Sequence, residues 1–141
     1  MDQRIDIVEY ALQIAEVAAK RSEDPFRKVG AVAINDENRI IATGYNGLIA
    51  HFQADRSVWK DRDVRRSIMI HAEQNLCSLF RRGEAKMVAV TTCPCSDCVR
   101  TLLAHGVSQV YYREPYETDD GGIAIAKFYG LSLIHKPNEA R

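Results

Sequence analysis

The sequence lacks the features that mark several large classes of protein. Its 141 residues carry 19 basic and 19 acidic side chains, and the resulting net charge of zero argues against a general affinity for nucleic acid or an anionic membrane. The first residues, Met1–Asp6, are charged and do not form the apolar stretch of a signal peptide. No apolar run approaches transmembrane length. We therefore expect a cytoplasmic protein that binds neither membranes nor nucleic acid.

Signs of disorder and of division into several domains are also missing. The chain has only four prolines, 46% of its residues are hydrophobic, and it shows no repeat, linker or low-complexity tract. Its length suits one well-buried core, so we expect residues 1–141 to form a single domain. Three of the four cysteines fall within one short motif, which does not resemble a disulfide framework.

Hydrophobic periodicity and turn residues predict alternating helices and strands. Residues 29–34 and 39–44 read as a β-hairpin, and residues 45–63 as a long loop of the kind that usually carries function. The remaining expected helices are residues 4–21, 71–82 with Gly83 as the C-cap, 96–105, and one that Asp119–Asp120 could cap and that runs to residue 129. The remaining expected strands are residues 87–91, 107–112 and 131–135. This alternation favours a mixed sheet covered by helices.

Two short segments contain the side chains of a catalytic zinc site. The first holds His71 and Glu73, and the second is Pro94–Cys98, which begins Pro-Cys and ends in a second cysteine, Cys98. The pattern H-x-E followed by P-C-x-x-C is the signature of zinc nucleobase deaminases. One imidazole and two thiolates, from His71, Cys95 and Cys98, leave the fourth tetrahedral position of one zinc ion open, which is typical of a catalytic site.

The spacing of these residues indicates how they converge. Residues two apart do not face each other inside a helix, so His71 and Glu73 can meet one metal only at a helix start. Cys95 and Cys98 lie one turn apart at the start of a second helix. Because thiolates donate charge to zinc and weaken its effect on bound water, a nearby base is needed, and Glu73 is the candidate.

A redox pair and a structural zinc site are two other interpretations of the same residues. A C-x-x-C pair alone could be a redox site, but Pro94 and the separate His71 argue against that chemistry. A structural zinc would recruit a fourth ligand, and the two spare thiols are better explained as a bystander near the metal, Cys93, and a core residue, Cys77.

The chain resembles the deoxycytidylate (dCMP) deaminases of the cytidine deaminase-like superfamily. Besides the two zinc segments, Asp24-Pro25, Val29–Val32, Gly44-Tyr45-Asn46-Gly47 and Asn75 carry the resemblance, which covers about residues 21–136. It implies a three-layer α/β/α sandwich around a five-stranded mixed sheet. It also implies a homo-oligomer, commonly a hexamer.

The resemblance also implies roles for individual residues. Asn46 would reach the deoxyribose hydroxyl, the Ala72 backbone N–H would contact the cytosine carbonyl, and Tyr116 would border the base or the sugar. Arg82 matches a position that reads the 5′-phosphate in some members, and Arg65 is a second possible substrate contact.

Members of the resembled group are often activated by dCTP and inhibited by dTTP. The segment Gly44, Tyr45, Asn46 and Gly47 would lie near that regulatory site, with Mg²⁺ accompanying the bound triphosphate. Some members bind a second, structural zinc through Cys and His after this segment. Here the chain continues Leu48–His51 without cysteine, so we expect no second zinc and a polar loop role for His51.

The expected function is zinc-dependent hydrolytic deamination of dCMP to dUMP and ammonia, which would supply dUMP for thymidylate synthesis. One alternative is a nucleic-acid deaminase of the tRNA adenosine type, against which the neutral charge counts. Another is a non-catalytic zinc scaffold, which would not need the Glu73 carboxylate. The arginines that flank the motif, among them Arg62, Arg65 and Arg66, are expected to supply at least one contact to a 5′-phosphate.

Overall fold

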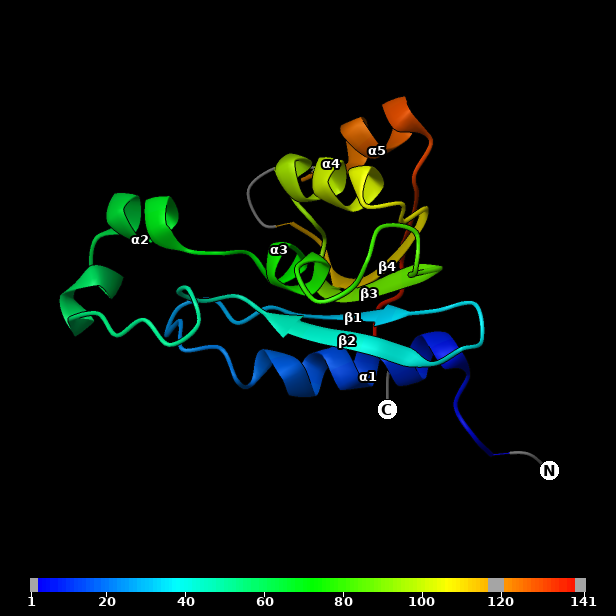
Figure 1. Ribbon diagram of the computed structural model, residues 1–141, viewed down its shortest axis with the longest axis horizontal. Helices are drawn as coiled ribbons and strands as arrows, with labels where there is room; N and C mark the ends of the chain where they lie inside the picture. The colour runs from blue at the N-terminus through cyan, green and yellow to red at the C-terminus, as the bar shows by residue number, and fades with distance from the viewer. Residues whose placement is uncertain (1–2, 117–120, 139–141) are drawn as a thin grey trace.

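A computed structural model describes residues 3–116 and 121–138, and its centre is one five-stranded sheet (Figure 1). The strand order is β2-β1-β3-β4-β5, and β1 pairs antiparallel with both β2 and β3. The pairs β3–β4 and β4–β5 are parallel, so the predicted mixed sheet is confirmed. The strands are β1 (Gly30–Ile34), β2 (Ile40–Tyr45), β3 (Met87–Thr92), β4 (Gln109–Glu114) and β5 (Ser132–His135).

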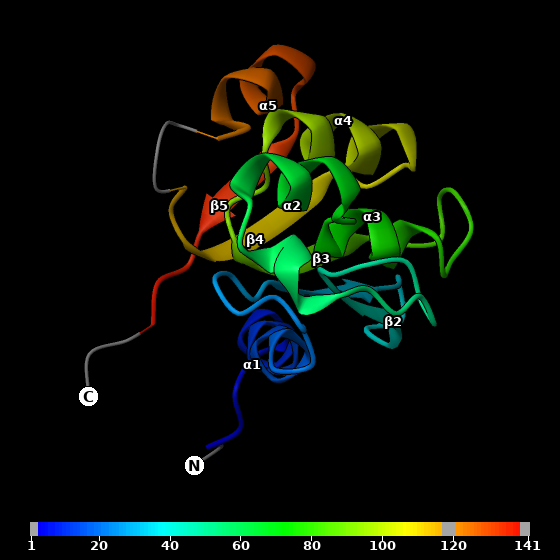
Figure 2. The same ribbon diagram turned by 90° about the vertical axis from the view of Figure 1, so that its left-hand side faces the viewer.

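Helices cover both faces of this sheet (Figures 1 and 2). α1 (Ile7–Ala19) lies on one face, and α3 (Ala72–Cys77), α4 (Ser96–Ala104) and α5 (Ile123–Tyr129) lie on the other. Alternate side chains of a strand point to opposite faces, so Val32 and Ile34 pack in the core under α1 while Ala31 and Ala33 join the core of the other face. The predicted three-layer α/β/α sandwich is confirmed.

Asp119–Asp120, the expected cap of the last helix, lies outside the described residues. None of the helices within the described ranges combines the length and the apolar character needed to cross a membrane.

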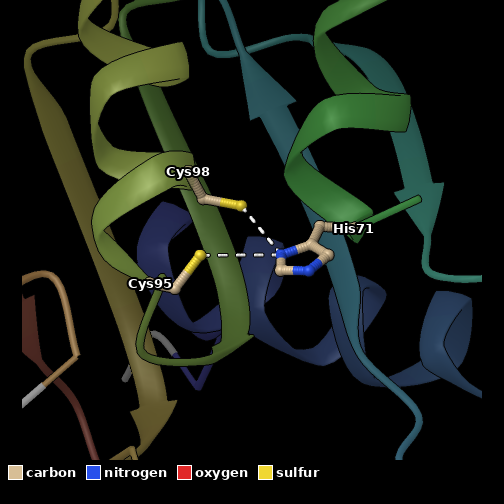
Figure 3. A group of neighbouring side chains, drawn as sticks. All are labelled: His71, Cys95 and Cys98. Carbon is tan, nitrogen blue, oxygen red and sulfur yellow. Dashed lines mark hydrogen bonds between the residues drawn. The ribbon is translucent and has the colours of Figure 1, made fainter. Parts of the chain in front are cut away.

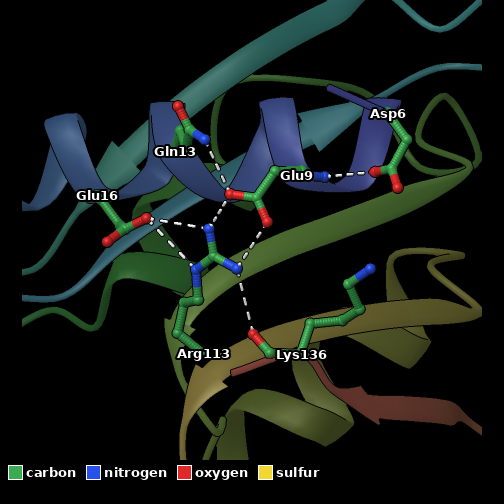
Figure 4. A network of polar contacts seen from close by, with 6 residues as sticks. All are labelled: Asp6, Glu9, Gln13, Glu16, Arg113 and Lys136. Atoms are coloured by element: carbon green, nitrogen blue, oxygen red, sulfur yellow. Dashed lines mark hydrogen bonds and ion pairs between the residues drawn. The ribbon is translucent and has the colours of Figure 1, made fainter. Parts of the chain in front are cut away.

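A buried arginine ties α1 to the sheet on the face opposite the candidate site (Figure 4). Arg113 of β4 is only 2% exposed, and its Nη1 donates to Glu9 Oε1 at 3.0 Å and to the Lys136 carbonyl at 3.3 Å. Its Nη2 forms a close ion pair with Glu9 and lies 3.2 Å from Glu16 Oε1. The Arg113 guanidinium lowers the pKa of the Glu9 carboxyl to about 2.

α3 is shorter than the sequence predicts. It ends at Cys77 with Ser78 as the C-cap, where the Ser78 hydroxyl donates to the Asn75 carbonyl at 2.6 Å, and it does not continue to residue 82. Phe80 then turns inward and lies edge-on against His105 at the end of α4, with 4.8 Å between ring centroids. Gly83 does adopt the left-handed conformation, with φ of 87°, but in a turn whose N–H donates to the His105 carbonyl.

The predicted loop of residues 45–63 was wrong in its second half. The 3-10 helix η1 (Arg56–Trp59) and the helix α2 (Arg62–Ile68) together form an arm, residues 55–69, that projects from the sandwich (Figure 1). No residue of η1 or α2 is buried, and the apolar pattern of α2 is limited to Val64 and Ile68, four residues apart. Its start is fixed by Asp61, whose Oδ1 accepts the main-chain N–H groups of Asp63 and Val64.

Candidate active site

The two zinc segments meet where α3 and α4 begin. His71 is the N-cap residue of α3, and Cys95 is the N-cap residue of α4, with Cys98 in its first turn. The strand-like pairing of Gly47 with Ile70 places the chain directly before His71, through hydrogen bonds of 3.0 and 2.7 Å. The predicted convergence of two helix starts is therefore confirmed, because only there can His71 and Glu73 face the same point.

The candidate ligand atoms lie at distances that suit one metal ion (Figure 3). His71 Nδ1 is 3.2 Å from Cys98 Sγ and 3.6 Å from Cys95 Sγ, and all three ligand atoms lie within 4.8 Å of one another. A tetrahedral zinc with Zn–S of about 2.3 Å and Zn–N of about 2.0–2.1 Å requires nitrogen–sulfur separations of roughly 3.6 Å. Among the described residues this is the one such cluster.

The electrostatics of this cluster also suit a cation. A hydrogen bond from Cys98 lowers the pKa of the Cys95 thiol to about 4, while the neighbouring Cys95 raises the pKa of Cys98. The hydrogen bond with Cys95 raises the pKa of His71 as well. The three groups therefore share protons, and a dication would displace them by favouring two thiolates and a neutral imidazole.

Glu73 lies next to this cluster without belonging to it. The side chain is 4% exposed, and burial raises the pKa of its carboxyl to about 7. A group with a pKa near neutrality can both accept and release a proton at physiological pH. This is the property that the sequence interpretation required of Glu73 as a proton carrier.

A cavity of about 820 Å³ opens above the cluster and is large enough for a nucleotide. Of the five residues expected to contact substrate, four line it, namely Asn46, Arg65, Ala72 and Tyr116. His71, Glu73 and Cys95 form its floor. The structure thus brings the expected chemistry and most of the expected binding residues into one space.

Arg82 is the exception. The resemblance gives it contact with the 5′-phosphate, near the end of a helix expected to run from residue 71 to residue 82, but α3 ends at Cys77. Arg82 lies in the following turn, does not line the cavity, and its Nε donates to the Ala104 carbonyl at 2.8 Å. Its guanidinium therefore caps the end of α4.

Two further residues line the cavity wall, Arg27 and Asp24. The Arg27 guanidinium carbon lies 5.0 Å from the centroid of the Tyr116 ring. Asp24 is 2% exposed and faces the same cavity. Asp24-Pro25 was part of the resemblance, but a buried carboxylate at this position cannot be distinguished from an ordinary turn residue by sequence pattern alone.

The segment Gly44–Gly47 contains the end of β2 and packs against α3 and the residue before His71. A Cβ atom on Gly44 would lie 2.9 Å from both the Ala72 carbonyl oxygen and the Leu76 nitrogen, so glycine permits the close packing of α3 on β2. The Tyr45 carbonyl accepts a hydrogen bond from Asn75 Nδ2 at 2.8 Å. Asn46, only 6% exposed, holds the residue 27–29 main chain through both of its amide atoms.

The remaining cysteines and histidines behave largely as expected. Cys77 is 8% exposed and joins the core, whereas Cys93 lines the cavity outside the ligand cluster. His105 and His135 each hold a main-chain carbonyl, of Phe80 at 2.8 Å and of Arg113 at 2.7 Å. His51 is an exposed loop residue with a φ of 68°.

The fold and the His-Cys-Cys site with its buried glutamate define the class of zinc-binding deaminases. Residues 5–114 match the family described as the cytidine and deoxycytidylate deaminase zinc-binding region, and the chain belongs to this family. It is 32% identical over 134 residues to the deoxycytidylate deaminase of Saccharomyces cerevisiae, which covers 88% of the chain and 43% of that protein. The chain thus spans less than half of the yeast relative.

Two further comparisons cover more of the similar protein. Human deoxycytidylate deaminase is 27% identical over 141 residues, with 94% of this chain and 79% of the human protein covered. The crystal structure of the dCMP deaminase of cyanophage S-TIM5 in complex with dCMP and dUMP superposes with a TM-score of 0.77 at 25% identity. It covers 96% of this chain and 100% of the phage chain.

Proposed function

We propose that the protein catalyses hydrolytic deamination of dCMP to dUMP and ammonia. The observation that carries this proposal is one cavity with a His-Cys-Cys cluster and a buried Glu73 at its floor and arginines in its wall. The floor provides the candidate zinc ligands and the proton carrier for deamination, and the arginines provide the positive charge that binds the phosphate of a nucleoside monophosphate. The names of the yeast and human relatives and the nucleotides bound to the phage enzyme support the same choice of substrate.

His71, Cys95 and Cys98 would hold one zinc ion, which when bound supplies a water activated for attack at neutral pH. Glu73 would accept a proton from the water that attacks C4 of the cytosine ring and would give it to ring N3. The hydroxyl then bound to C4 would release its proton, and Glu73 would carry this proton to the amine as the C4–N bond breaks, C4 becomes a carbonyl and ammonia leaves. A carboxyl whose pKa is about 7 suits both directions of transfer.

Other residues of the wall orient the nucleotide. We propose that the Ala72 N–H, in the first turn of α3, donates to the cytosine carbonyl and that the Tyr116 ring borders the base or the sugar, since both residues line the cavity. Asn46 is proposed to reach the deoxyribose hydroxyl with the amide hydrogen that its contact with Met69 Sδ, at 3.4 Å, uses only weakly.

The phosphate is proposed to bind the arginines on the cavity wall and not Arg82. The Arg65 guanidinium already has two contacts within the protein. Its Nη1 donates to the Trp59 carbonyl at 2.9 Å, and the guanidinium lies 4.5 Å from the centre of the Phe26 ring. Within residues 3–116 and 121–138, the Arg27 guanidinium contacts the Tyr116 ring and has no hydrogen bond or ion pair, which leaves its N–H groups available in the plane of the guanidinium. We therefore assign the principal phosphate contact to Arg27.

Regulation by nucleoside triphosphates is proposed for the segment Gly44–Gly47, with dCTP as activator, dTTP as inhibitor and Mg²⁺ bound with the triphosphate. The packing of Gly44 against α3 and the pairing of Gly47 with Ile70 support it, because a shift of this segment would reach His71 directly. The expected result is a sigmoidal dependence of rate on dCMP that dCTP makes hyperbolic and dTTP suppresses. Hyperbolic kinetics that neither triphosphate alters would contradict the proposal.

In the cell we propose a cytoplasmic homo-hexamer that supplies dUMP for thymidylate synthesis. Sedimentation of the zinc-loaded protein tests the assembly, and a monomer at all concentrations would refute it.

Ammonia release measured across deoxycytidine, dCMP, dCTP and CMP tests the central proposal. We expect dCMP to give the highest kcat/KM, since the arginines of the cavity wall can bind its single phosphate while the base lies at the floor. Equal activity on dCMP and deoxycytidine would exclude phosphate recognition, and no activity on any of the four would exclude the reaction.

A further inference from the structure

We infer that Asp24 is a positioning residue for phosphate recognition, which sets the main chain at Arg27 and thereby the guanidinium over Tyr116. The inference rests on the proposed function, because it takes the phosphate of dCMP as the partner of Arg27. Asp24 itself need not touch the nucleotide.

The Asp24 carboxylate is built into a turn at the cavity wall. The residue is 2% exposed, and its Oδ1 accepts the main-chain N–H groups of Phe26 at 2.8 Å and of Arg27 at 3.1 Å. Its own N–H donates to Ser22 Oγ at 3.2 Å. A buried carboxylate is costly unless it is hydrogen-bonded, so these contacts determine the path of the chain through residues 24–27.

The other side of Arg27 is fixed as well. Its carbonyl accepts Asn46 Nδ2 at 2.8 Å, while Asn46 Oδ1 accepts the Val29 N–H at 2.8 Å. Both main-chain polar groups of Arg27 are thus held by buried side chains, the N–H by Asp24 and the carbonyl by Asn46. With the backbone held on both sides, the Arg27 side chain begins from one defined position and reaches the Tyr116 ring at 5.0 Å.

One carboxylate therefore orients two elements of the wall. Besides Arg27, Asp24 holds the N–H of Phe26, and the Phe26 ring lies under the Arg65 guanidinium at 4.5 Å. Phe26 is 65% exposed, so burial contributes little to fixing the position of its ring. Loss of Asp24 is expected to make the positions of both arginines in the cavity wall less well defined. His71 and Glu73 at the start of α3, and the two candidate ligand cysteines at the start of α4, should keep their positions.

The test compares Asp24→Ala, Asp24→Asn, Arg27→Ala and the Asp24→Ala/Arg27→Ala double variant as full-length zinc-loaded proteins. Each is assayed for kcat/KM and KM on dCMP and on deoxycytidine, and for bound zinc. Asp6→Ala is the matched control, since Asp6 Oδ1 also accepts a main-chain N–H, that of Glu9 at 2.8 Å, but Asp6 does not line the cavity.

We expect Asp24→Ala to lower kcat/KM for dCMP by about tenfold or more, mainly through KM, with deoxycytidine changed less than about threefold and zinc retained. Asp24→Asn keeps an acceptor oxygen and should recover most of the loss. In the Arg27→Ala background, Asp24→Ala should add less than about twofold, because residues that act through one contact are not additive. Asp6→Ala should leave the ratio of the two substrates unchanged.

Equal losses on both substrates, no recovery in Asp24→Asn, or multiplicative effects in the double variant would each overturn the inference. If Asp24→Ala does not fold, Asp24→Glu carries the same test, since it keeps the charge but displaces the oxygens by one methylene. If the wild-type protein does not deaminate dCMP, the proposed function itself is refuted. If the wild type is active but Asp24→Ala lowers kcat/KM equally for dCMP and deoxycytidine, only this inference is refuted.

Discussion

The floor and the wall of the cavity are built in different ways. At the floor, His71 and Cys95 are the N-cap residues of α3 and α4 and Glu73 lies in the first turn of α3, and both helices pack on a buried sheet. In the wall, Arg65 comes from an arm whose two helices bury no residue, and Arg27 from a segment held by side-chain hydrogen bonds. The floor is thus positioned by the core, and the wall by a few polar contacts.

This difference separates two tasks. Deamination needs ligand and proton-carrying atoms placed within a few tenths of an ångström, which helix ends anchored in a core provide. Choice of substrate needs only a positive charge at the right distance from the substrate phosphate, which residues on loops can provide. Changes at the floor should therefore affect every cytosine substrate alike, and changes in the wall should affect only those with phosphate.

The largest effect is expected from loss of a metal ligand. Cys98→Ala removes one of three ligand atoms, so bound zinc should fall from about one per chain to near none, and dCMP turnover should vanish. Metal content by atomic absorption and an assay of dUMP formation measure both. Cys93→Ala is the control, because Cys93 is a cavity cysteine outside the cluster. Full zinc and activity in Cys98→Ala would show that the site is elsewhere.

Glu73→Gln should abolish most turnover without loss of metal. Glu73 is a proton carrier and not a ligand, so zinc should stay at about one per chain while kcat falls by about 10²–10⁴. Removal of the buried carboxyl, whose pKa is about 7, should leave the fold intact. A loss of less than about tenfold would refute the role assigned to Glu73.

Arg27→Ala and Arg82→Ala contrast the wall with a position outside it. Loss of a charge-assisted phosphate contact costs about 1.5–3 kcal/mol, so Arg27→Ala should lower kcat/KM for dCMP by roughly ten- to a hundredfold. Arg82→Ala, which removes only the contact with the Ala104 carbonyl, should change it by less than about threefold. The reverse order of the two effects would return the phosphate site to Arg82.

The smallest effect on activity is expected on the opposite face of the sheet. The Glu9 carboxyl has a pKa lowered to about 2 from an ordinary 4.5, mainly by its hydrogen bond with Arg113. A depressed folded-state pKa adds stability above about pH 4.5, and this stability is lost as the pH falls toward 2. With 24% side-chain exposure, the contribution should be about 1–3 kcal/mol.

Glu9→Gln should therefore be less stable than wild type at pH 7, with the difference shrinking as the pH falls from about 5 toward 2. Urea unfolding across this range measures the difference, and dCMP kinetics at pH 7 should stay within about twofold. A constant difference at all pH values would mean that the charge of Glu9 is not what stabilises the fold.

The floor could be predicted from the sequence in detail. The spacing of His71 and Glu73 and of Cys95 and Cys98 predicts two helix starts at one site, and the structure shows both helix starts with the three ligand atoms within 4.8 Å of one another. The order of elements likewise leads to the mixed sheet and its covering helices. These inferences succeed because ligand spacing and hydrophobic periodicity are local properties of the chain.

The wall could not be predicted in the same way. α2 has no buried face, and its short sequence has only Val64 and Ile68 at helical spacing. The early end of α3 accompanies a tertiary contact, the packing of Phe80 against His105. The partnership of Arg27 with Tyr116 joins residues that are far apart in the sequence. Such contacts depend on tertiary structure, which overrides local pattern.

The most direct test of the separation between floor and wall is kcat/KM for dCMP and deoxycytidine in zinc-loaded wild type, Glu73→Gln and Arg27→Ala. We predict that Glu73→Gln lowers both values by a similar factor of about 10² or more, whereas Arg27→Ala lowers only the value for dCMP. The account would be contradicted if Glu73→Gln spared either substrate, or if Arg27→Ala reduced both substrates equally.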